Sequence, residues 1–214
     1  MQYHPIEIND SDTCKTKDCL AKTLRIDPKN VKAHWILGTL YQREENYQNA
    51  IEELTVAVQL APSYNLGYPY RDRANCKNNL GNDTGAVNDM NEAIKFNPTE
   101  RYFYIERASY LHNLDKLELA LKDYDRALEI WSEFRSARIE RAKVLVELKQ
   151  YKKALKDYNI LKDGKDFSDY DFYYRGIAKY NMNETGGACK DWQSVANTCK
   201  EAKNSLEKYC KTDK

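Results

Sequence analysis

The sequence has few residues that break helices and few that commonly form catalytic or metal sites. Its 214 residues include only eight glycines, five prolines and three histidines. No apolar run approaches the roughly 20 residues that a membrane-spanning helix needs, and the polar start at residues 1–10 has no signal-peptide core. The formal net charge of +1 provides no general attraction to nucleic acid or to an anionic membrane. Any partner must therefore be inferred from local features.

The histidines and cysteines do not form a recognisable metal or catalytic motif. His4, His34 and His112 are far apart in the sequence, HExxH spacing is absent, and no two cysteines have the CxxC spacing typical of zinc sites. Gly186 and Gly187 are better interpreted as the turn before a helix than as a loop that binds phosphate. We expect no metal, no cofactor and no enzymatic activity.

Small residues recur in the sequence at a nearly constant period. Each recurrence begins with an alanine that is followed seven residues later by a second small or apolar residue, and successive recurrences are 36 and then 34 residues apart. The alanines are Ala50 and Ala57, Ala86 and Ala93, Ala120 and Ala127, then Ala154 and Ala188, and the bulky residues beside them are Leu54, Met90, Tyr124, Tyr158 and Trp192. This spacing places the residues on one stripe of a helix, which we predict to be buried.

A second stripe with small residues precedes each alanine stripe. Its members are Leu37 and Gly38, Arg73 and Ala74, Arg107 and Ala108, Arg141 and Ala142, and Arg175 and Gly176. Turn-like stretches such as 45–47 and 81–83 lie between the two stripes. Prolines at 28, 62 and 98 follow the ends of predicted helices, which proline cannot continue. Each unit is therefore predicted to be a helix, a short turn and a second helix.

These repeated features resemble the tetratricopeptide repeat family, including its bacterial type with a cysteine-containing C-terminal unit. The resemblance implies an all-α fold, a right-handed superhelical solenoid of antiparallel helix hairpins. It covers residues 31–202 as five units, 31–64, 67–100, 101–134, 135–168 and 169–202, with Asn65 and Leu66 as a two-residue insertion. Residues 1–10 are expected to form a tail, 11–30 a capping half repeat with Ser11 as its N-cap, and 203–214 the end of a solvating helix and a tail.

The resemblance also implies where a partner binds. In the family, the first helix of each unit lines a concave groove that holds a peptide. The corresponding residues here are Trp35, Tyr68, Arg71, Asn75, Asn78, Tyr102, Ile105, Ser109, His112, Lys143, Tyr170 and Tyr173. Aromatic rings offer large contact areas, and amides can bond a peptide backbone. We therefore expect a scaffold or adaptor that binds another protein or a peptide segment, without binding nucleic acid or inserting into a membrane.

Several alternatives stay open for these residues. The set also fits a solvated inner face, Trp35 fits the core as well as the groove, and His112 fits a solvated helix end. The alternative function is a structural module that self-assembles through its outer surface or its ends. A site for the C-terminal carboxylate of a chaperone, known in one member type, is not expected, because Glu106 and Glu140 stand where that site has Asn and Arg.

The six cysteines also leave alternatives open. They exceed what a reduced cytosolic protein of this size usually contains, yet all six fit small, mostly buried apolar positions. The resemblance implies a disulfide between Cys189 and Cys210 in the closing unit. Cys14 and Cys19 are too far apart within a regular helix and can meet only if the helix begins late. The compartment stays open between the cytoplasm and, after export, the periplasm.

Overall fold

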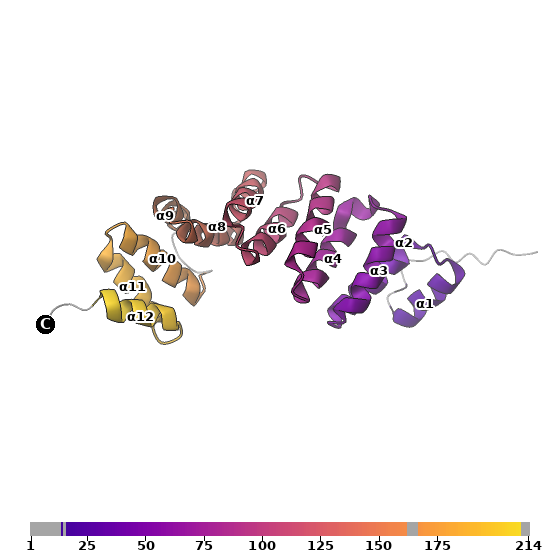
Figure 1. Ribbon diagram of the computed structural model, residues 1–214, viewed down its shortest axis with the longest axis horizontal. Coiled ribbons are helices and arrows are strands. Elements are labelled where there is room, and N and C mark those ends of the chain that lie inside the picture. The colour runs from indigo at the N-terminus through magenta and orange to yellow at the C-terminus, as the bar shows by residue number, and fades with distance from the viewer. Residues whose placement is uncertain (1–13, 15, 162–166, 211–214) are drawn as a thin grey trace, which may run out of the picture. The chain divides into compact units, whose positions relative to one another are not determined.

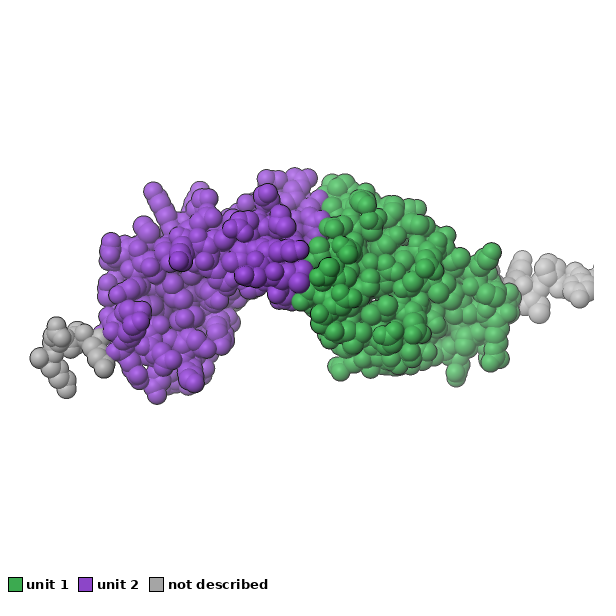
Figure 2. All heavy atoms as spheres, viewed as in Figure 1, with its two compact units in different colours: residues 1–103 green, residues 104–214 purple. Residues whose placement is uncertain are grey.

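The described part of the chain is almost entirely helical (Figure 1). The computed structural model describes residues 14, 16–161 and 167–210. These residues form twelve α-helices and one short 3-10 helix, and none of them lies in a strand. The chain divides into two compact units, unit 1 with residues 1–103 and unit 2 with residues 104–214 (Figure 2).

Unit 1 is built from helix hairpins that follow a short first helix. Its elements are α1 Lys17–Ile26, α2 Val31–Arg43, α3 Tyr47–Leu60, the 3-10 helix η1 Tyr64–Gly67, α4 Tyr68–Asn79, α5 Asp83–Phe96 and the first turn of α6 Arg101–Asn113. Helix α2 packs on α3, and α4 packs on α5. Asn65 and Leu66, which we predicted to be an insertion between units, both adopt left-handed backbone conformations in η1, immediately before α4 begins.

Helix α1 begins later than the sequence suggested. Its N-cap is Thr16, whose side chain accepts a hydrogen bond from the backbone N–H of Cys19. Ser11, the expected N-cap, lies outside the described residues. Because Cys14 precedes the helix, it can reach Cys19, and the two form a disulfide with their Cα atoms 5.6 Å apart. The late helix start that this pair requires is therefore present.

Unit 2 continues the same arrangement. Its elements after α6 are α7 Leu117–Ile130, α8 Arg135–Glu147, α9 Tyr151–Ile160, α10 Asp169–Asn181, α11 Thr185–Val195 and α12 Lys200–Tyr209. Helix α8 packs on α9, α10 on α11, and α12 on α11. The helices α2, α4, α6, α8 and α10 are called first helices here, and α3, α5, α7, α9 and α11 second helices.

The alanine stripe forms the core of the second helices, as predicted. All eight alanines of the stripe have no exposed surface, and the bulky residues beside them are at most 3% exposed. Alanine lets a neighbouring helix approach closely, while the bulky residue fills the space between helices. Near the end of the chain, Trp192 packs with Val195, Cys199 and Ala202 in one cluster, so α12 covers apolar surface of the last hairpin.

One residue in the turn of each hairpin has a left-handed backbone conformation. These residues are Glu45, Gly81, Asp115, Lys149 and Asn183, with φ angles from 56° to 76°. The N–H of the following residue bonds to a carbonyl near the end of the first helix, as from Gln150 N to Leu145 O at 2.7 Å. Such a bond closes the helix end. Only one of the five turn residues is glycine, so the packing of the two helices holds the other four in a less favourable conformation.

Among the described residues, four arginine–aspartate pairs of the same geometry join a first helix to a second helix. In each, an arginine donates from Nε and Nη2 to the two carboxylate oxygens of an aspartate, over 2.6 to 2.9 Å. The pairs are Arg73–Asp89, Arg107–Asp123, Arg141–Asp157 and Arg175–Asp191. The aspartates are 2% to 6% exposed. A buried carboxylate needs such partners, and the two-point geometry suits the guanidinium fork.

Candidate functional site

Two of the expected groove residues in unit 1 are engaged within the fold. The indole N–H of Trp35 donates to Oδ2 of Asp72 at 2.7 Å, and its ring meets Tyr64 edge-on with centroids 5.8 Å apart. The hydroxyl of Tyr68 donates to Oε2 of Glu100 at 2.8 Å. Trp35 is half-buried, so it joins α2 to α4 while part of its ring stays accessible.

The other expected residues of unit 1 differ in exposure. Tyr102 is 42% exposed, whereas Arg71, Asn75 and Asn78 are half-buried. Nη1 of Arg71 lies 3.4 Å from Oδ1 of Asp72. The side-chain amide of Asn78 donates to Asp83, which ties α4 to the start of α5. These side chains thus contribute to the hairpins themselves.

In unit 2, the first helices enclose a pocket of about 320 Å³. Its lining is His112 from α6, Tyr124 from α7, Glu140, Lys143, Val144 and Glu147 from α8, and Ser168, Tyr170 and Tyr174 at the start of α10. The structure therefore brings together His112, Lys143 and Tyr170 of the expected set. Ile105, Ser109 and Tyr173 do not line this pocket, although the ring of Tyr173 contacts that of Tyr170 edge-on.

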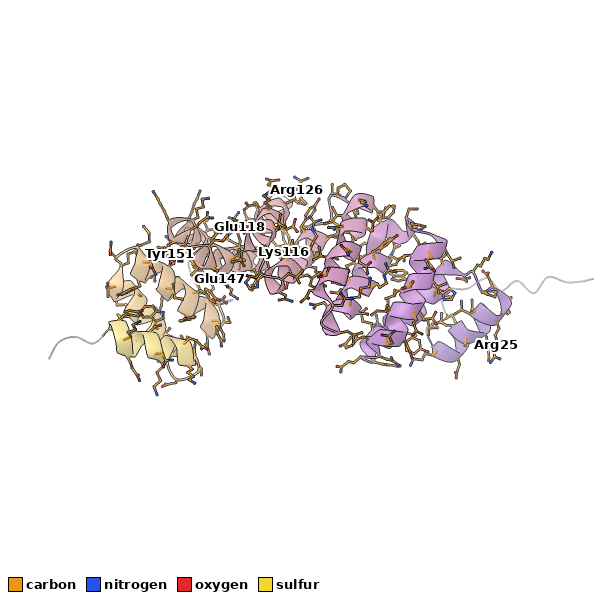
Figure 3. All side chains as sticks on the ribbon, in the orientation of Figure 1. Arg25, Lys116, Glu118, Arg126, Glu147 and Tyr151 are labelled. Atoms are coloured by element: carbon orange, nitrogen blue, oxygen red, sulfur yellow. A yellow bond between two sulfur atoms is a disulfide. The ribbon has the colours of Figure 1, made fainter. Side chains whose placement is uncertain are left out.

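Glu147 is the last residue of α8 (Figure 3). Its carboxylate is held from two sides. The Tyr174 hydroxyl donates to Oε1 at 2.9 Å, and Nε2 of His112 lies 2.8 Å from Oε2. Burial, followed by the hydrogen bond to Glu147, raises the pKa of Tyr174. Tyr174 consequently keeps its proton at neutral pH and remains a donor to Glu147.

Lys143 provides a positive charge in the pocket, in contrast to the carboxylate of Glu147. Its Nζ lies 2.8 Å from Oδ1 of Asp171 and 3.0 Å from Oε1 of Glu140. Burial alone lowers the pKa of Lys143, but the hydrogen bonds and charges of Asp171 and Glu140 outweigh it and raise the pKa overall. Lys143 therefore stays charged, and the side chain of Glu140 is 46% exposed.

Sequence reasoning did not assign Tyr174 to the site. It counted Glu147 among the groove positions of the family, and it considered Glu140 only as a mismatch to the site for a chaperone carboxylate. A signal for Tyr174 was present, because Tyr170 and Tyr174 are four residues apart and so share one face of a helix. The role of Glu147 depends on His112 and Tyr174, which meet it across helices, whereas Glu140 bonds to Lys143 three residues further along α8. The site is thus more acidic than the expected residues alone suggest.

The last hairpin carries a second disulfide. Cys189 of α11 is joined to Cys210, the C-cap of α12, with Cα atoms 5.8 Å apart. Cys76 and Cys199 are buried free thiols. Across the described residues, no group of three or more His, Cys, Asp or Glu side chains is placed to hold a metal ion. None of the described helices is long and apolar enough to cross a membrane.

Comparison with known proteins identifies the class of fold. Residues 31–64 match the model of the tetratricopeptide repeat. The chain is similar to the structure of YrrB, described as a TPR protein with an unusual peptide-binding site, at 15% identity and a TM-score of 0.77 over 88% of this chain and 97% of that one. It is also similar to pilF of Pseudomonas aeruginosa, at 17% identity and a TM-score of 0.75 over 90% of this chain and 88% of that one.

A third similar structure contains a bound peptide. The first TPR of Spaghetti (RPAP3), bound to the HSP90 peptide SRMEEVD, is 27% identical, with a TM-score of 0.53 over 57% of this chain and 95% of that one. No curated protein matches the chain in sequence. The repeated hairpins and these similarities define an all-α helical-repeat fold. Residues 31–64 thus match a tetratricopeptide repeat, and the chain has the fold of the tetratricopeptide-repeat structures to which it is similar.

Proposed function

We propose that this protein binds a peptide segment of a partner protein on the face formed by its first helices, which corresponds to the concave groove of the family, and that it has no catalytic role. The observation that carries this proposal is the pocket of about 320 Å³ in unit 2, to which three first helices contribute. YrrB and the first TPR of Spaghetti support it as relatives in fold whose structures are described with a peptide-binding site and a bound peptide.

The charges of the pocket favour a particular kind of segment. Glu140 and Glu147 line it, Asp171 lies behind Lys143, and Lys143 is the one lysine in the lining. The three carboxylates outnumber the one lysine, so a segment with a lysine or arginine side chain fits better than one with a free carboxylate. The rings of Tyr170 and Tyr174 add apolar contact area beside these charges.

The half-buried and exposed first-helix residues of unit 1 offer a separate contact surface. Tyr102 exposes a ring, and Tyr68 keeps its hydroxyl bonded to Glu100, so its ring is already positioned. Because little side-chain entropy remains to be lost, such rings are suited to contact a peptide. We propose them as contacts of the same function, secondary to the pocket of unit 2.

The test begins with partner identification by affinity capture from the native cell and mass spectrometry. Synthetic peptides that tile the captured partner would then be titrated against the protein. The double variant His112→Ala and Tyr170→Ala should weaken binding of the active peptide by roughly tenfold or more, because each removes a contact from the pocket wall. Both side chains are at least 40% exposed, so the fold should persist.

A matched control removes side chains from a second helix of the same unit. Leu119→Ala and Lys122→Ala in α7 change two exposed residues and should leave the affinity unchanged. Equal affinity of the pocket variant and the wild type would refute this use of the first-helix face. In that case, size-exclusion chromatography with light scattering would test the alternative function, self-assembly.

A further inference from the structure

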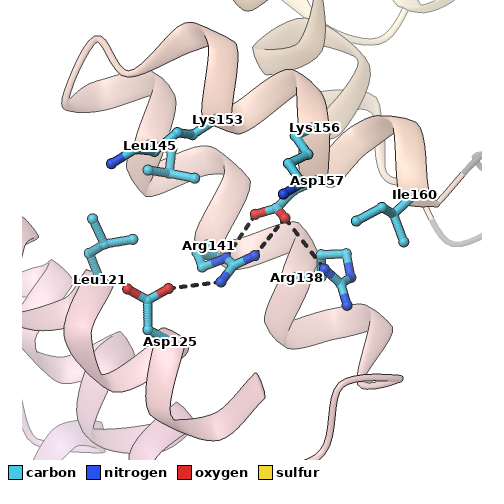
Figure 4. A pocket seen from close by; sticks show the side chains of 9 residues that line it. All are labelled: Leu121, Asp125, Arg138, Arg141, Leu145, Lys153, Lys156, Asp157 and Ile160. Carbon is cyan, nitrogen blue, oxygen red and sulfur yellow. Dashed lines mark hydrogen bonds and ion pairs between the residues drawn. The ribbon is translucent and has the colours of Figure 1, made fainter. Parts of the chain in front are cut away.

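Helix α9, one of the second helices, has a cavity on each side of its exposed face. The first, of about 380 Å³, is lined by Leu121, Asp125, Arg138, Arg141, Leu145, Lys153, Lys156, Asp157 and Ile160 (Figure 4). The second, of about 570 Å³, is lined by Lys152, Leu155, Lys156, Asn159, Ile160, Met182 and Glu184. Lys156 and Ile160 line both, so the cavities are neighbours. We call them together the α9 groove; it shares no lining residue with the pocket of the first helices.

The carboxylates inside the first cavity are already neutralised. Arg141 lies between them, with Nε and Nη2 bonded to Asp157 and Nη1 bonded to Asp125 at 2.8 Å (Figure 4). Arg138 adds a further cation, 3.4 Å from Asp157. Two arginines thus oppose two aspartates, and neither aspartate is left to repel an incoming anion.

The lysines of the α9 groove add positive charge that is not neutralised by paired carboxylates. Lys152, Lys153 and Lys156 are exposed, and within the described part of the chain no carboxylate pairs with any of them. Lys153 donates to the side-chain oxygen of Gln150 at 2.8 Å, which is a neutral partner. Glu184 is the acidic residue of the second cavity. Lysines therefore outnumber the available carboxylates along the α9 groove.

Apolar side chains form the remainder of the groove. Ile160 is 50% exposed and Met182 is 40% exposed, and both line the second cavity. Leu121 and Leu145 line the first cavity, and Leu155 lines the second. A hollow of this kind accepts a bulky aliphatic or aromatic side chain, while the lysines around it attract negative charge.

We infer that the α9 groove binds an acidic peptide segment that carries bulky apolar side chains. The apolar side chains enter the two cavities beside Ile160, and carboxylates of the segment pair with Lys153 and Lys156. The lining contains no aromatic ring on which a nucleic-acid base could stack, which disfavours single-stranded nucleic acid as the occupant. This site is centred on α9 and would act separately from the pocket of the first helices, with which it shares no lining residue.

The test uses a fluorescent synthetic peptide rich in glutamate, with leucines at intervals, titrated against the full chain by fluorescence anisotropy. Saturable binding is expected, and it should weaken as salt is added. The double variant Lys153→Glu and Lys156→Glu should reduce the affinity by roughly tenfold or more. Ile160→Ser should also weaken binding, whereas a peptide with serine in place of leucine should bind poorly even to the wild type.

The control variant is Lys190→Glu and Lys203→Glu, which changes the net charge equally at exposed positions of α11 and α12. It should retain wild-type affinity. Equal losses for the two double variants would overturn the inference, because binding would then follow net charge alone. The inference also fails if Ile160→Ser has no effect, or if single-stranded RNA or anionic vesicles compete better than the peptide does for the Lys153 and Lys156 surface.

Discussion

Arg141 of α8 holds Asp157 of α9 through two hydrogen bonds, of 2.8 Å from Nε to Oδ2 and of 2.6 Å from Nη2 to Oδ1. The same pairing recurs in four hairpins, with arginine and aspartate always 16 residues apart. Nη1 of Arg141 also reaches Asp125 of the preceding second helix, as Nη1 of Arg73 reaches Thr55 at 3.1 Å. These arginines therefore join neighbouring hairpins as well as the two helices of one hairpin.

Removing one member of this pair should be strongly destabilising. Asp157 is 2% exposed, so Asp157→Ala leaves the Arg141 guanidinium partly buried with only Asp125 opposite it. We expect a loss of about 3 kcal/mol in the free energy of unfolding, measured by urea denaturation. The double variant Arg141→Met and Asp157→Leu should recover part of this loss, because the charge of Arg141 is removed together with its partner, while Arg138 still loses the carboxylate of Asp157.

The exposed pair Arg126 and Glu129 provides a control for that experiment. Its side chains are 48% and 64% exposed, so Glu129→Ala should cost less than about 1 kcal/mol. A similar loss for Asp157→Ala and Glu129→Ala would contradict the structural role assigned to the buried pair.

Gly176 and Gly186 should respond in opposite directions to alanine. A Cβ atom on Gly176 would lie 2.3 Å from Nε1 of Trp192, a ring that is 1% exposed, whereas nothing lies within 4 Å of a Cβ on Gly186. Gly176→Ala should therefore cost about 1 to 3 kcal/mol, net of any gain in helix propensity. Gly186→Ala should raise stability by up to about 1 kcal/mol. Both variants would be unfolded in urea, with tryptophan fluorescence as the signal. Equal unfolding midpoints for the two variants would show that Trp192 does not pack against Gly176.

Cys76 should resist alkylation in the folded protein. Burial, with a smaller effect from Asp72, raises the pKa of its thiol to about 12, from an ordinary value of 9.0. At pH 9.0 iodoacetamide should modify Cys76 in urea but not in buffer, as measured by mass spectrometry of peptides. The unfolded state releases the thiol proton of Cys76 more readily than the folded state does. The contribution of this thiol to the free energy of unfolding is therefore complete below about pH 9 and is lost as the pH rises towards about 12. Modification at equal rates in both conditions would place Cys76 at the surface.

The disulfide of the last hairpin should control the local stability of α12. In oxidised protein, the bridge between Cys189 and Cys210 spans 21 residues, so Cys210→Ser should cost about 3 kcal/mol. The bridge between Cys14 and Cys19 spans only five residues and should contribute less. Hydrogen exchange of the α12 amides should accelerate in Cys210→Ser and stay unchanged in Cys19→Ser. Unchanged exchange in both would indicate that packing on Trp192 alone holds the helix.

The fold was predictable because its signal is repeated. One stripe of alanines with a bulky neighbour is weak evidence, but recurrence at steps of 36 and 34 residues predicts hairpins that bury the same stripe each time. The ion pairs had a signal of the same period, since Arg141 and Asp157 recur with it, but their pairing became evident only in the structure. The limits assigned to the individual repeats stay a prediction.

The candidate site was less predictable than the fold. Family positions indicated which side chains belong to first helices, and His112, Lys143 and Tyr170 do meet at one pocket. The same positions also included Trp35, whose N–H is used by Asp72, and Ser109, which lies outside that pocket. A repeat position specifies a helix face, but it does not specify the partners that a long polar side chain finds on the next helix.

The sequence by itself determined the helix hairpins and their core, because helix periodicity and the position of small residues are local properties that recur in every unit. Only the tertiary structure decided which charges remain available for a partner. Glu147 is bound by Tyr174 and His112, whereas Lys156 meets no carboxylate among the described residues. That difference arises from contacts between helices, and the free energy of a charged side chain depends on those neighbours more than on its own type.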